Sequence, residues 1–229
     1  MSPEVAEPIE AATVVLIRDS EVGVEVLMLE RNSEIHFGGM WVFPGGRVDA
    51  GDWDGIDADE THATLHAARA AAARETAEEA GLHVERSAFV SHSHWLPPGR
   101  QGRRYATWFF IARAPEGDVT IDNGEITSHR WTTPSEALRA RDAGKIELVP
   151  PTWVTLHRLS RATSVDDALE EAANRESPFF VTKIVKGPEA PVAVWEGDPA
   201  YTTDDLDMAG PYRRLVMSNN GWRWEGDAP

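Results

Sequence analysis

Cysteine is absent from this chain of 229 residues. Its absence excludes disulfides, thiolate catalysis and zinc sites built from cysteine. Long apolar runs are missing as well, and none approaches the ~20 residues that a membrane-spanning helix needs. The first residues, MSPEVAEPIEAA, lack the basic and then apolar order of a secretory signal. We therefore expect a cytoplasmic protein with no membrane partner.

Positive charge is scarce. The chain has 22 Lys and Arg against 38 Asp and Glu, which gives a net charge of −16. So acidic a protein is poorly suited to bind a nucleic-acid backbone, because that binding depends on basic side chains. If it handles phosphates, metal ions are needed to bring the two negative partners together. The hydrophobic fraction of 41% is that of an ordinary globular protein.

The first part of the chain predicts strands and loops. Two β-branched, apolar runs at 12–18 and 24–30 are separated by a turn at Asp19–Gly23, and this pattern indicates a β-hairpin. A further apolar segment leads into Pro44-Gly45-Gly46. Residues 50–59 are rich in Asp and Gly and predict a loop.

A long helix is expected next, from about Asp59 to Ala80. Alanine dominates its middle, Asp57 or Asp59 is a candidate N-cap, and Gly81 is a natural stop. Alanine on several sides lets a helix lie close to other elements. Small residues also leave room beside the acidic residues that follow them.

The rest of the chain continues the mixed pattern. We expect strands over 83–94, 104–112, 119–121 and 126–132, and a helix that starts near Thr133. After these come two helices, 152–160 and 164–174, and strands at 179–186, 192–196 and 213–224, the last folded at Asn219-Asn220-Gly221. The alternation implies a mixed α/β domain. We divide the chain into a domain, 1–150, and an extension, 151–229, which would serve as a dimer interface or a lid.

The segment Arg74–Leu82 carries the densest chemistry. At ~100° per residue, Glu75, Glu78 and Glu79 fall within one arc of a helix surface. Arg74 is the only basic residue close by in the sequence. Three clustered carboxylates repel one another unless a cation joins them, and hard cations such as Mg²⁺ take oxygen ligands of this kind. For this segment alone, a solvated helix face is the alternative.

The order Trp41…Phe43-Pro44-Gly45-Gly46…Arg74-Glu75-x-x-Glu78-Glu79-x-Gly81-Leu82 resembles the Nudix hydrolase signature. The resemblance covers roughly residues 12–150, and it implies a Nudix-type α/β/α sandwich with a mixed sheet. It also implies metal-dependent hydrolysis of a nucleoside diphosphate derivative. The spacing between Gly46 and Arg74 is about twice the usual one, so a loop insertion near 50–59 is expected. The glutamate that usually precedes the arginine would fall at His66, and Thr76 replaces a larger apolar residue.

The resemblance assigns roles to individual residues. Glu78 and Glu79 match the principal ligands of a divalent metal, Mg²⁺ or Mn²⁺, and Glu75 matches a third ligand or a base. Arg74 matches a residue that orients the glutamates through a salt bridge. The Gly45 carbonyl matches a group that completes the metal shell. Family members recruit one more acid from another loop, for which Glu125 is the candidate, so the general base is either Glu75 or Glu125.

Substrate-binding candidates are Arg31, Arg104 and Gly46. Arg31 ends a strand before the glycine loop, Arg104 belongs to a basic patch, and Gly46 lets a ligand approach the backbone. Residues 95–110, the insertion and the extension look like a Nudix subgroup linked to coenzyme A diphosphatases. The expected substrate is thus coenzyme A or an acyl derivative, followed by ADP-ribose or NADH, with a homodimer as a candidate assembly. The alternatives are a nucleotide-sensing module without catalysis and an interaction protein that uses its C-terminal strands.

Overall fold

The computed structural model describes residues 7–34, 38–57, 62–99 and 104–227. Its main sheet contains eight strands, which are β1 (Ile9–Ser20), β2 (Gly23–Arg31), β3 (Trp41–Val42), β4 (Gly45–Arg47), β5 (Val90–Leu96), β6 (Tyr105–Arg113), β7 (Ile126–Thr132) and β8 (Phe179–Val181). The strand order is β3-β2-β1-β6-β5-β8, while β4 also pairs with β1 and β7 with β2. The β1–β6 and β5–β8 pairs are parallel and the others are antiparallel, so the sheet is mixed as predicted.

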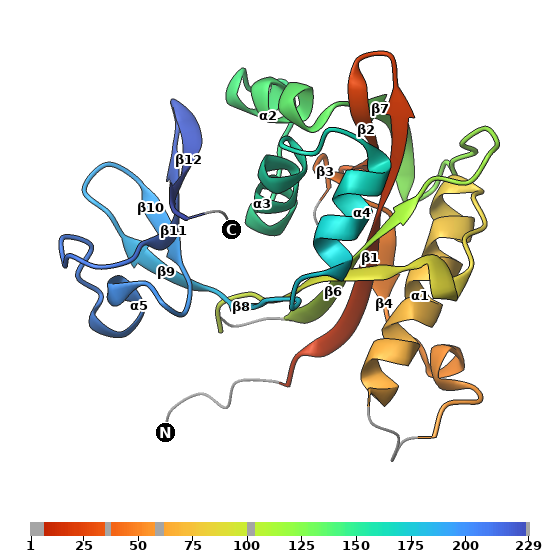
Figure 1. The fold of residues 1–229 in the computed structure, drawn as a ribbon, viewed down its shortest axis with the longest axis horizontal. Helices are drawn as coiled ribbons and strands as arrows, with labels where there is room; N and C mark the ends of the chain where they lie inside the picture. Colours follow the sequence, from red (N-terminus) through yellow and green to blue (C-terminus); the bar gives the residue numbers. More distant parts are fainter. Residues whose placement is uncertain (1–6, 35–37, 58–61, 100–103, 228–229) are drawn as a thin grey trace.

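Helices cover both faces of this sheet (Figure 1). They are α1 (Ala63–Ala80), α2 (Pro134–Asp142), α3 (Pro150–Leu159) and α4 (Val165–Ala173). Strand β1 explains the layering, because its successive side chains point to opposite faces. Ala12, Val14 and Leu16 pack with alanines of α1, whereas Val15 and Ile17 pack with residues of α3 and α4. The arrangement confirms the predicted α/β sandwich.

Helix α1 lies close to the sheet because its inner face is made of alanine. Ala68, Ala71 and Ala72 are fully buried. The helix ends at Gly81 as predicted, with φ of 68° and an N–H that donates to the Ala77 carbonyl. Its start differs from the prediction. It begins at Ala63 rather than near Asp59, so Asp57 is not its cap, and residues 58–61 lie outside the described ranges.

Two predicted strands are wrong in whole or in part. The 83–94 segment is extended only from Val90, after a short 3-10 turn, η2 (Arg86–Ala88). Residues 119–121 form no strand. The Thr120 N–H instead donates to the Ala80 carbonyl at 2.9 Å and caps the end of α1. Both segments carry apolar residues because they cover the α1 side of the core, not because they pair in a sheet.

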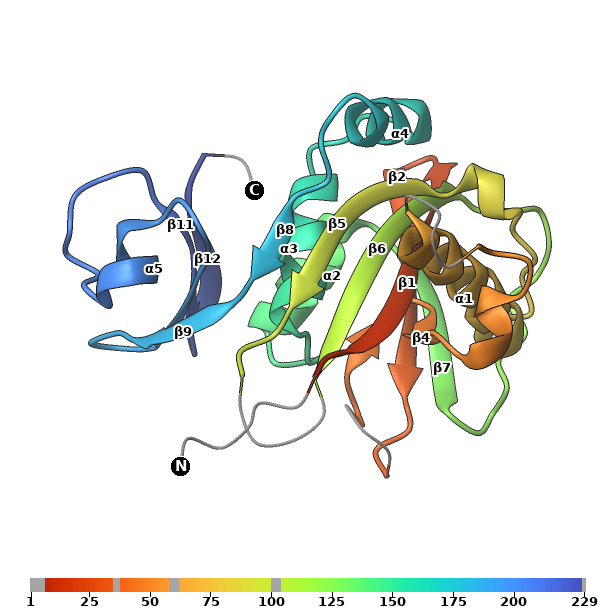
Figure 2. The same cartoon turned by 90° about the horizontal axis from the view of Figure 1, so that it is seen from below.

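The helices predicted after residue 150 are present, as are the strands near 192–196 and 213–224, but the strand expected over 179–186 divides at Thr182 between two sheets. Thr133 and Ser164 cap α2 and α4 through their side chains. Strands β9 (Lys183–Lys186), β10 (Pro191–Val194), β11 (Arg213–Ser218) and β12 (Gly221–Gly226) form a separate antiparallel sheet beside the main one (Figure 2). A short helix, α5 (Pro199–Thr203), was not predicted.

The division at residue 150 stays a prediction. The extension contributes nearly all of α3, together with α4 and strand β8, to the layers of the main sheet, in addition to its own small sheet. Within the described ranges, no helix is long and apolar enough to cross a membrane.

Candidate active site

The glycine pair lies where β4 meets α1. Strand β4 pairs with β1 so that Gly45 faces Thr13 and Gly46 faces Ala12. The Gly45 N–H donates a hydrogen bond to Glu79 Oε2 at 2.9 Å. At Gly46, an added Cβ would clash with the carboxylate of Glu75. At Gly45, an added Cβ would instead meet the backbone of β1 at Ala12 and Thr13, so neither position of the pair has room for a side chain as the neighbours stand.

The glutamates of α1 differ in their surroundings. Glu79 is 5% exposed, and burial raises its pKa to about 8, although the Gly45 N–H and Arg31 act in the opposite direction. Burial also raises the pKa of Glu75, against the effect of neighbouring Arg74. Glu78 is more than half exposed. The buried carboxylates are thus the ones whose negative charge most needs a cation nearby.

Glu125 reaches the site from a separate loop. Asp122 shapes this loop, since its carboxylate accepts hydrogen bonds from the N–H groups of Glu125 and Ile126 at 2.8 and 2.9 Å. Asn32, at the end of β2, donates through its backbone to the Glu125 carbonyl and through its side chain to the Gly124 carbonyl. The loop is thereby tied to β2, which also carries Arg31.

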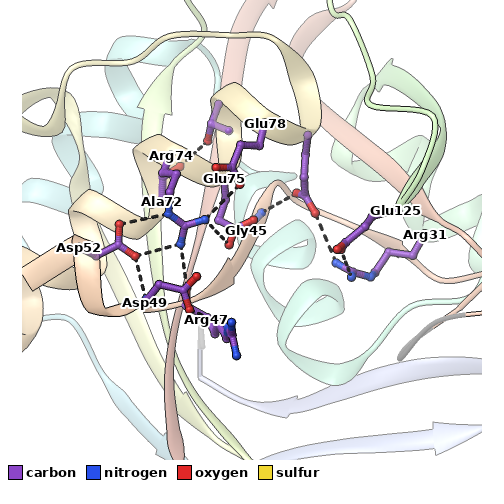
Figure 3. A network of polar contacts seen from close by, with 12 residues as sticks. Arg31, Gly45, Arg47, Asp49, Asp52, Ala72, Arg74, Glu75, Glu78 and Glu125 are labelled. Carbon is purple, nitrogen blue, oxygen red and sulfur yellow. Dashed lines mark hydrogen bonds and ion pairs between the residues drawn. The ribbon is translucent and has the colours of Figure 1, made fainter.

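Arg74 holds one end of the acidic face (Figure 3). Its guanidinium donates to both carboxylate oxygens of Asp52, at 3.2 and 2.9 Å. It also donates to Glu75 at 2.8 Å, to Glu78 at 3.1 Å and to the Arg47 carbonyl at 3.1 Å. The hydrogen bond to Asp52 is the largest cause of its raised pKa. All three nitrogens of this guanidinium are used.

Arg31 lies at the other end of the same face. Its guanidinium contacts Glu79 Oε1 at 3.4 Å and Glu125 Oε2 at 2.9 Å, as Figure 3 shows for Glu125. The side chain is 17% exposed. The structure thus brings together Arg31, Gly45, Gly46, Arg74, Glu75, Glu78, Glu79 and Glu125.

The carboxylates are directed toward these two arginines. As the side chains stand, no three His, Asp or Glu residues of the described ranges form a group that could hold a metal ion. Glu75 and Glu79 are nonetheless close enough to Glu125 for its charge to contribute to their raised pKa values. The site is a concentration of negative charge stabilised by two guanidinium groups.

A comparison with protein families shows to which family a chain with this site belongs. The model of the NUDIX domain matches residues 8–152, which is more than half of the chain. The chain belongs to the NUDIX family. The glycine pair, the acidic α1 and the loop of Glu125 all lie within the matched range.

Two curated NUDIX relatives are similar in sequence. Acyl-coenzyme A diphosphatase NUDT19 of Xenopus laevis is 32% identical over 135 residues, which is 56% of this chain and 35% of the relative. The protein of the same name from Gallus gallus is 35% identical over 139 residues, or 56% of this chain and 36% of the relative. The chain therefore matches little more than a third of either relative's length.

A solved structure confirms the NUDIX fold. The crystal structure of a NUDIX hydrolase from Alicyclobacillus acidocaldarius matches with a TM-score of 0.64 and 22% identity. The match covers 73% of this chain and 97% of that one. At this identity the similarity concerns the fold alone.

Asp52 is the residue of the NUDIX site that the sequence analysis missed. The only partners expected for Arg74 were the glutamates of its own helix. The structure supplies a further acid from η1 (Ala50–Trp53), at the start of the insertion. Asp52 is buried and also accepts a hydrogen bond from the Asp49 N–H at 2.9 Å.

Two other features lie away from the glutamates. Arg104 immediately precedes β6, and the pairing of β6, β1 and β4 puts Trp108, four residues later, level with Gly46. The role of Arg104 in substrate binding stays a prediction.

A cavity of about 560 Å³ borders Arg74 and α1, lined by Asp49, Ala73, Ala77 and Arg86 among others. It does not include the three glutamates of α1.

Proposed function

We propose that this chain is a metal-dependent pyrophosphohydrolase of nucleoside diphosphate derivatives. The observation that carries the proposal is the grouping of Glu75, Glu78, Glu79 and Glu125 beside the glycine pair of a NUDIX domain. NUDIX hydrolases generally use a divalent metal. The relatives named acyl-coenzyme A diphosphatase favour coenzyme A or an acyl derivative as substrate, ahead of ADP-ribose and NADH.

The donor set fits a hard divalent cation, Mg²⁺ or Mn²⁺. Every candidate ligand offers oxygen, and two of the carboxylates have raised pKa values that a nearby cation would lower. Glu75, Glu78, Glu79, Glu125 and the Gly45 carbonyl are the proposed ligands. When bound, the cation would neutralise the diphosphate and make water a better nucleophile.

The chain's own residues have separate tasks in the proposed reaction. Arg31 and Arg104 bind substrate phosphates, and Gly46 leaves the backbone open to the substrate. Arg74 orients the glutamates through its contacts with Glu75 and Glu78. Water attacks one phosphorus of the P–O–P linkage, the bridging bond breaks toward the other phosphate, and a carboxylate takes the proton of the water.

Glu75 and Glu125 are the two candidates for that proton. Glu75 is largely buried against Arg74, whereas Glu125 is exposed and pairs only with Arg31 among its described salt bridges. Replacing each by glutamine separates them. The base variant loses the acidic limb of the pH–rate profile, while the other variant keeps it at lower activity.

A substrate panel with Mg²⁺ or Mn²⁺ tests the function, with products identified by mass. We expect coenzyme A or acyl-coenzyme A to be cleaved to two phosphorylated products. We expect Glu78→Gln to remove this activity. Binding of these ligands without cleavage by the wild-type protein would instead identify a nucleotide-sensing module.

The predicted cytoplasmic location and homodimer are also part of this proposal. Light scattering on the purified chain over a range of concentrations tests the homodimer. A monomer at all concentrations would rule it out.

A further inference from the structure

Arg31 is held between two proposed metal ligands. Its side chain pairs with Glu79 and Glu125 and makes no other hydrogen bond or ion pair within the described ranges. Its Nε is buried and has no hydrogen-bond partner there. A buried guanidinium nitrogen without a partner is costly, so the side chain is incompletely satisfied in this position.

The backbone of Arg31, in contrast, is fixed. Its N–H donates to the Met40 carbonyl at 3.0 Å, and its carbonyl accepts from the Gly39 N–H at 2.9 Å. The β2–β7 register shifts at Glu30 and Arg31. A fixed backbone with a loosely satisfied side chain permits a change of partner without a change of fold.

The surroundings require a cation at this place. Glu79 is buried and lies near the charges of Glu75 and Glu125. Arg74 is occupied by Asp52, Glu75 and Glu78. Arg31 is therefore the charge that compensates Glu79 and Glu125, the same two carboxylates that a divalent cation would take.

We propose that Arg31 is an exchangeable counter-cation, which neutralises Glu79 and Glu125 until a divalent cation replaces it. This inference rests on the proposed function. Once displaced, the guanidinium is free to turn to a substrate phosphate, which offers acceptors for both its terminal nitrogens and its Nε. Arg31 would thus couple metal binding to substrate binding, because one event releases the group that the other uses.

Calorimetric titration with Mn²⁺ in the absence of substrate tests the exchange. Arg31→Gln removes the competing charge, so we expect its Mn²⁺ dissociation constant to fall by about fivefold or more relative to wild type. Arg31→Lys keeps the charge and should stay close to wild type. Arg18→Gln is the matched control, since it removes an Arg–Glu pair from the opposite end of the same hairpin. Unchanged or weaker Mn²⁺ binding by Arg31→Gln would overturn the proposal.

Thermal unfolding separates exchange from a fixed structural role. In EDTA, Arg31→Gln should have a lower Tm than wild type, because Glu125, together with Glu79 wherever it is ionised, loses its counter-charge. Saturating Mn²⁺ should remove most of that difference. A difference of the same size in EDTA and in Mn²⁺ would mean that Arg31 stays in place when metal binds, which contradicts exchange.

Kinetics supply the last readout, and they depend on the proposed function. For the best substrate of the panel, Arg31→Gln should raise KM about tenfold, the effect of losing one charge-assisted phosphate contact. If no substrate is cleaved, the proposed function fails, while the Mn²⁺ titration and the Tm comparison still decide the exchange. If cleavage occurs, but Arg31→Gln changes neither the Mn²⁺ dissociation constant nor the Tm difference between EDTA and Mn²⁺, only the exchange fails.

Discussion

The two arginines of the site form an instructive pair. Arg74 donates through all of its nitrogens to Asp52, Glu75, Glu78 and a backbone carbonyl. Arg31 donates to two carboxylates, one of them at 3.4 Å, and keeps a buried Nε without a partner in the described ranges. The same side chain is thus fully satisfied at one end of the acidic face and incompletely satisfied at the other.

The difference follows from where the partners come from. Asp52 lies outside the proposed metal ligands, so Arg74 has an anchor that remains when a cation binds. Both partners of Arg31 are proposed metal ligands, so a bound cation would leave the Arg31 side chain without either of its ion pairs. An anchored arginine keeps the carboxylates in place, whereas an arginine without an independent anchor is suited to change partners.

The largest effect is expected when Glu79, the buried acid that Arg31 neutralises, is replaced. Glu79→Gln should lower kcat by about 10³-fold, since a metal ligand contributes several kcal/mol to charge stabilisation in the transition state. The measurement is initial rates on the best substrate of the panel. Glu25→Gln, which replaces a glutamate of β2 paired with Arg18, is the control and should leave kcat unchanged. A Glu79→Gln enzyme with more than a tenth of wild-type kcat would remove Glu79 from the proposed ligand set.

The stability of the metal-free protein should depend on pH through Glu79. Its pKa is about 8 in the folded chain, against an ordinary value of 4.5. Between these values the folded state keeps a proton that the unfolded state has lost, so stability falls as pH rises and levels off above 8. We expect a loss on the order of 3 kcal/mol between pH 5 and pH 8. Urea unfolding in EDTA across this range measures it.

The matched variant for this dependence is Glu79→Gln, which cannot titrate. Its stability should change much less over the same pH range, and saturating metal should flatten the wild-type curve. An equally steep decline in Glu79→Gln would assign the dependence to other groups, of which Glu75 is the first to test.

Much of the fold was accessible from the sequence because its cause is local. Two β-branched, apolar runs with a turn between them predicted the hairpin, and alanine content with Gly81 predicted the helix and its end. The wrong strand at 119–121 shows the limit. Val119 and Ile121 are apolar because they cover the end of α1, and a short apolar run does not reveal whether it pairs or only packs.

The site was predictable as far as its residues share one helix or one motif. Glu75, Glu78, Glu79 and Arg74 lie together because helical spacing requires it. Glu125 was inferred only from the resemblance, and the structure brings it to Arg31. Asp52 was missed because its contact with Arg74 spans 22 residues of sequence and depends on how the insertion folds.

The next effect in size concerns the anchored arginine. Arg74→Met should lower the free energy of unfolding by about 2 kcal/mol, because it leaves buried Asp52 without a counter-charge. Urea unfolding measures the loss. Arg47→Met is the control: its pair with Asp49 is exposed, so the change should stay within about 0.5 kcal/mol. Equal effects at both positions would refute the special role of Arg74.

Asp52→Asn should have the smallest effect and is the sharpest test of the anchor. Asparagine keeps the shape but loses the charge, and its amide can direct a donor toward Arg74. We expect a loss of about 1 kcal/mol in stability and about tenfold in kcat, with KM nearly unchanged, because Asp52 acts only through Arg74. Asp54→Asn, an exposed change in the same loop, should alter neither quantity.

The double variant Asp52→Asn/Arg74→Met should lose no more stability or kcat than Arg74→Met alone, since both substitutions remove the same interaction. Additive losses would mean that Asp52 supports the site by a route that does not pass through Arg74.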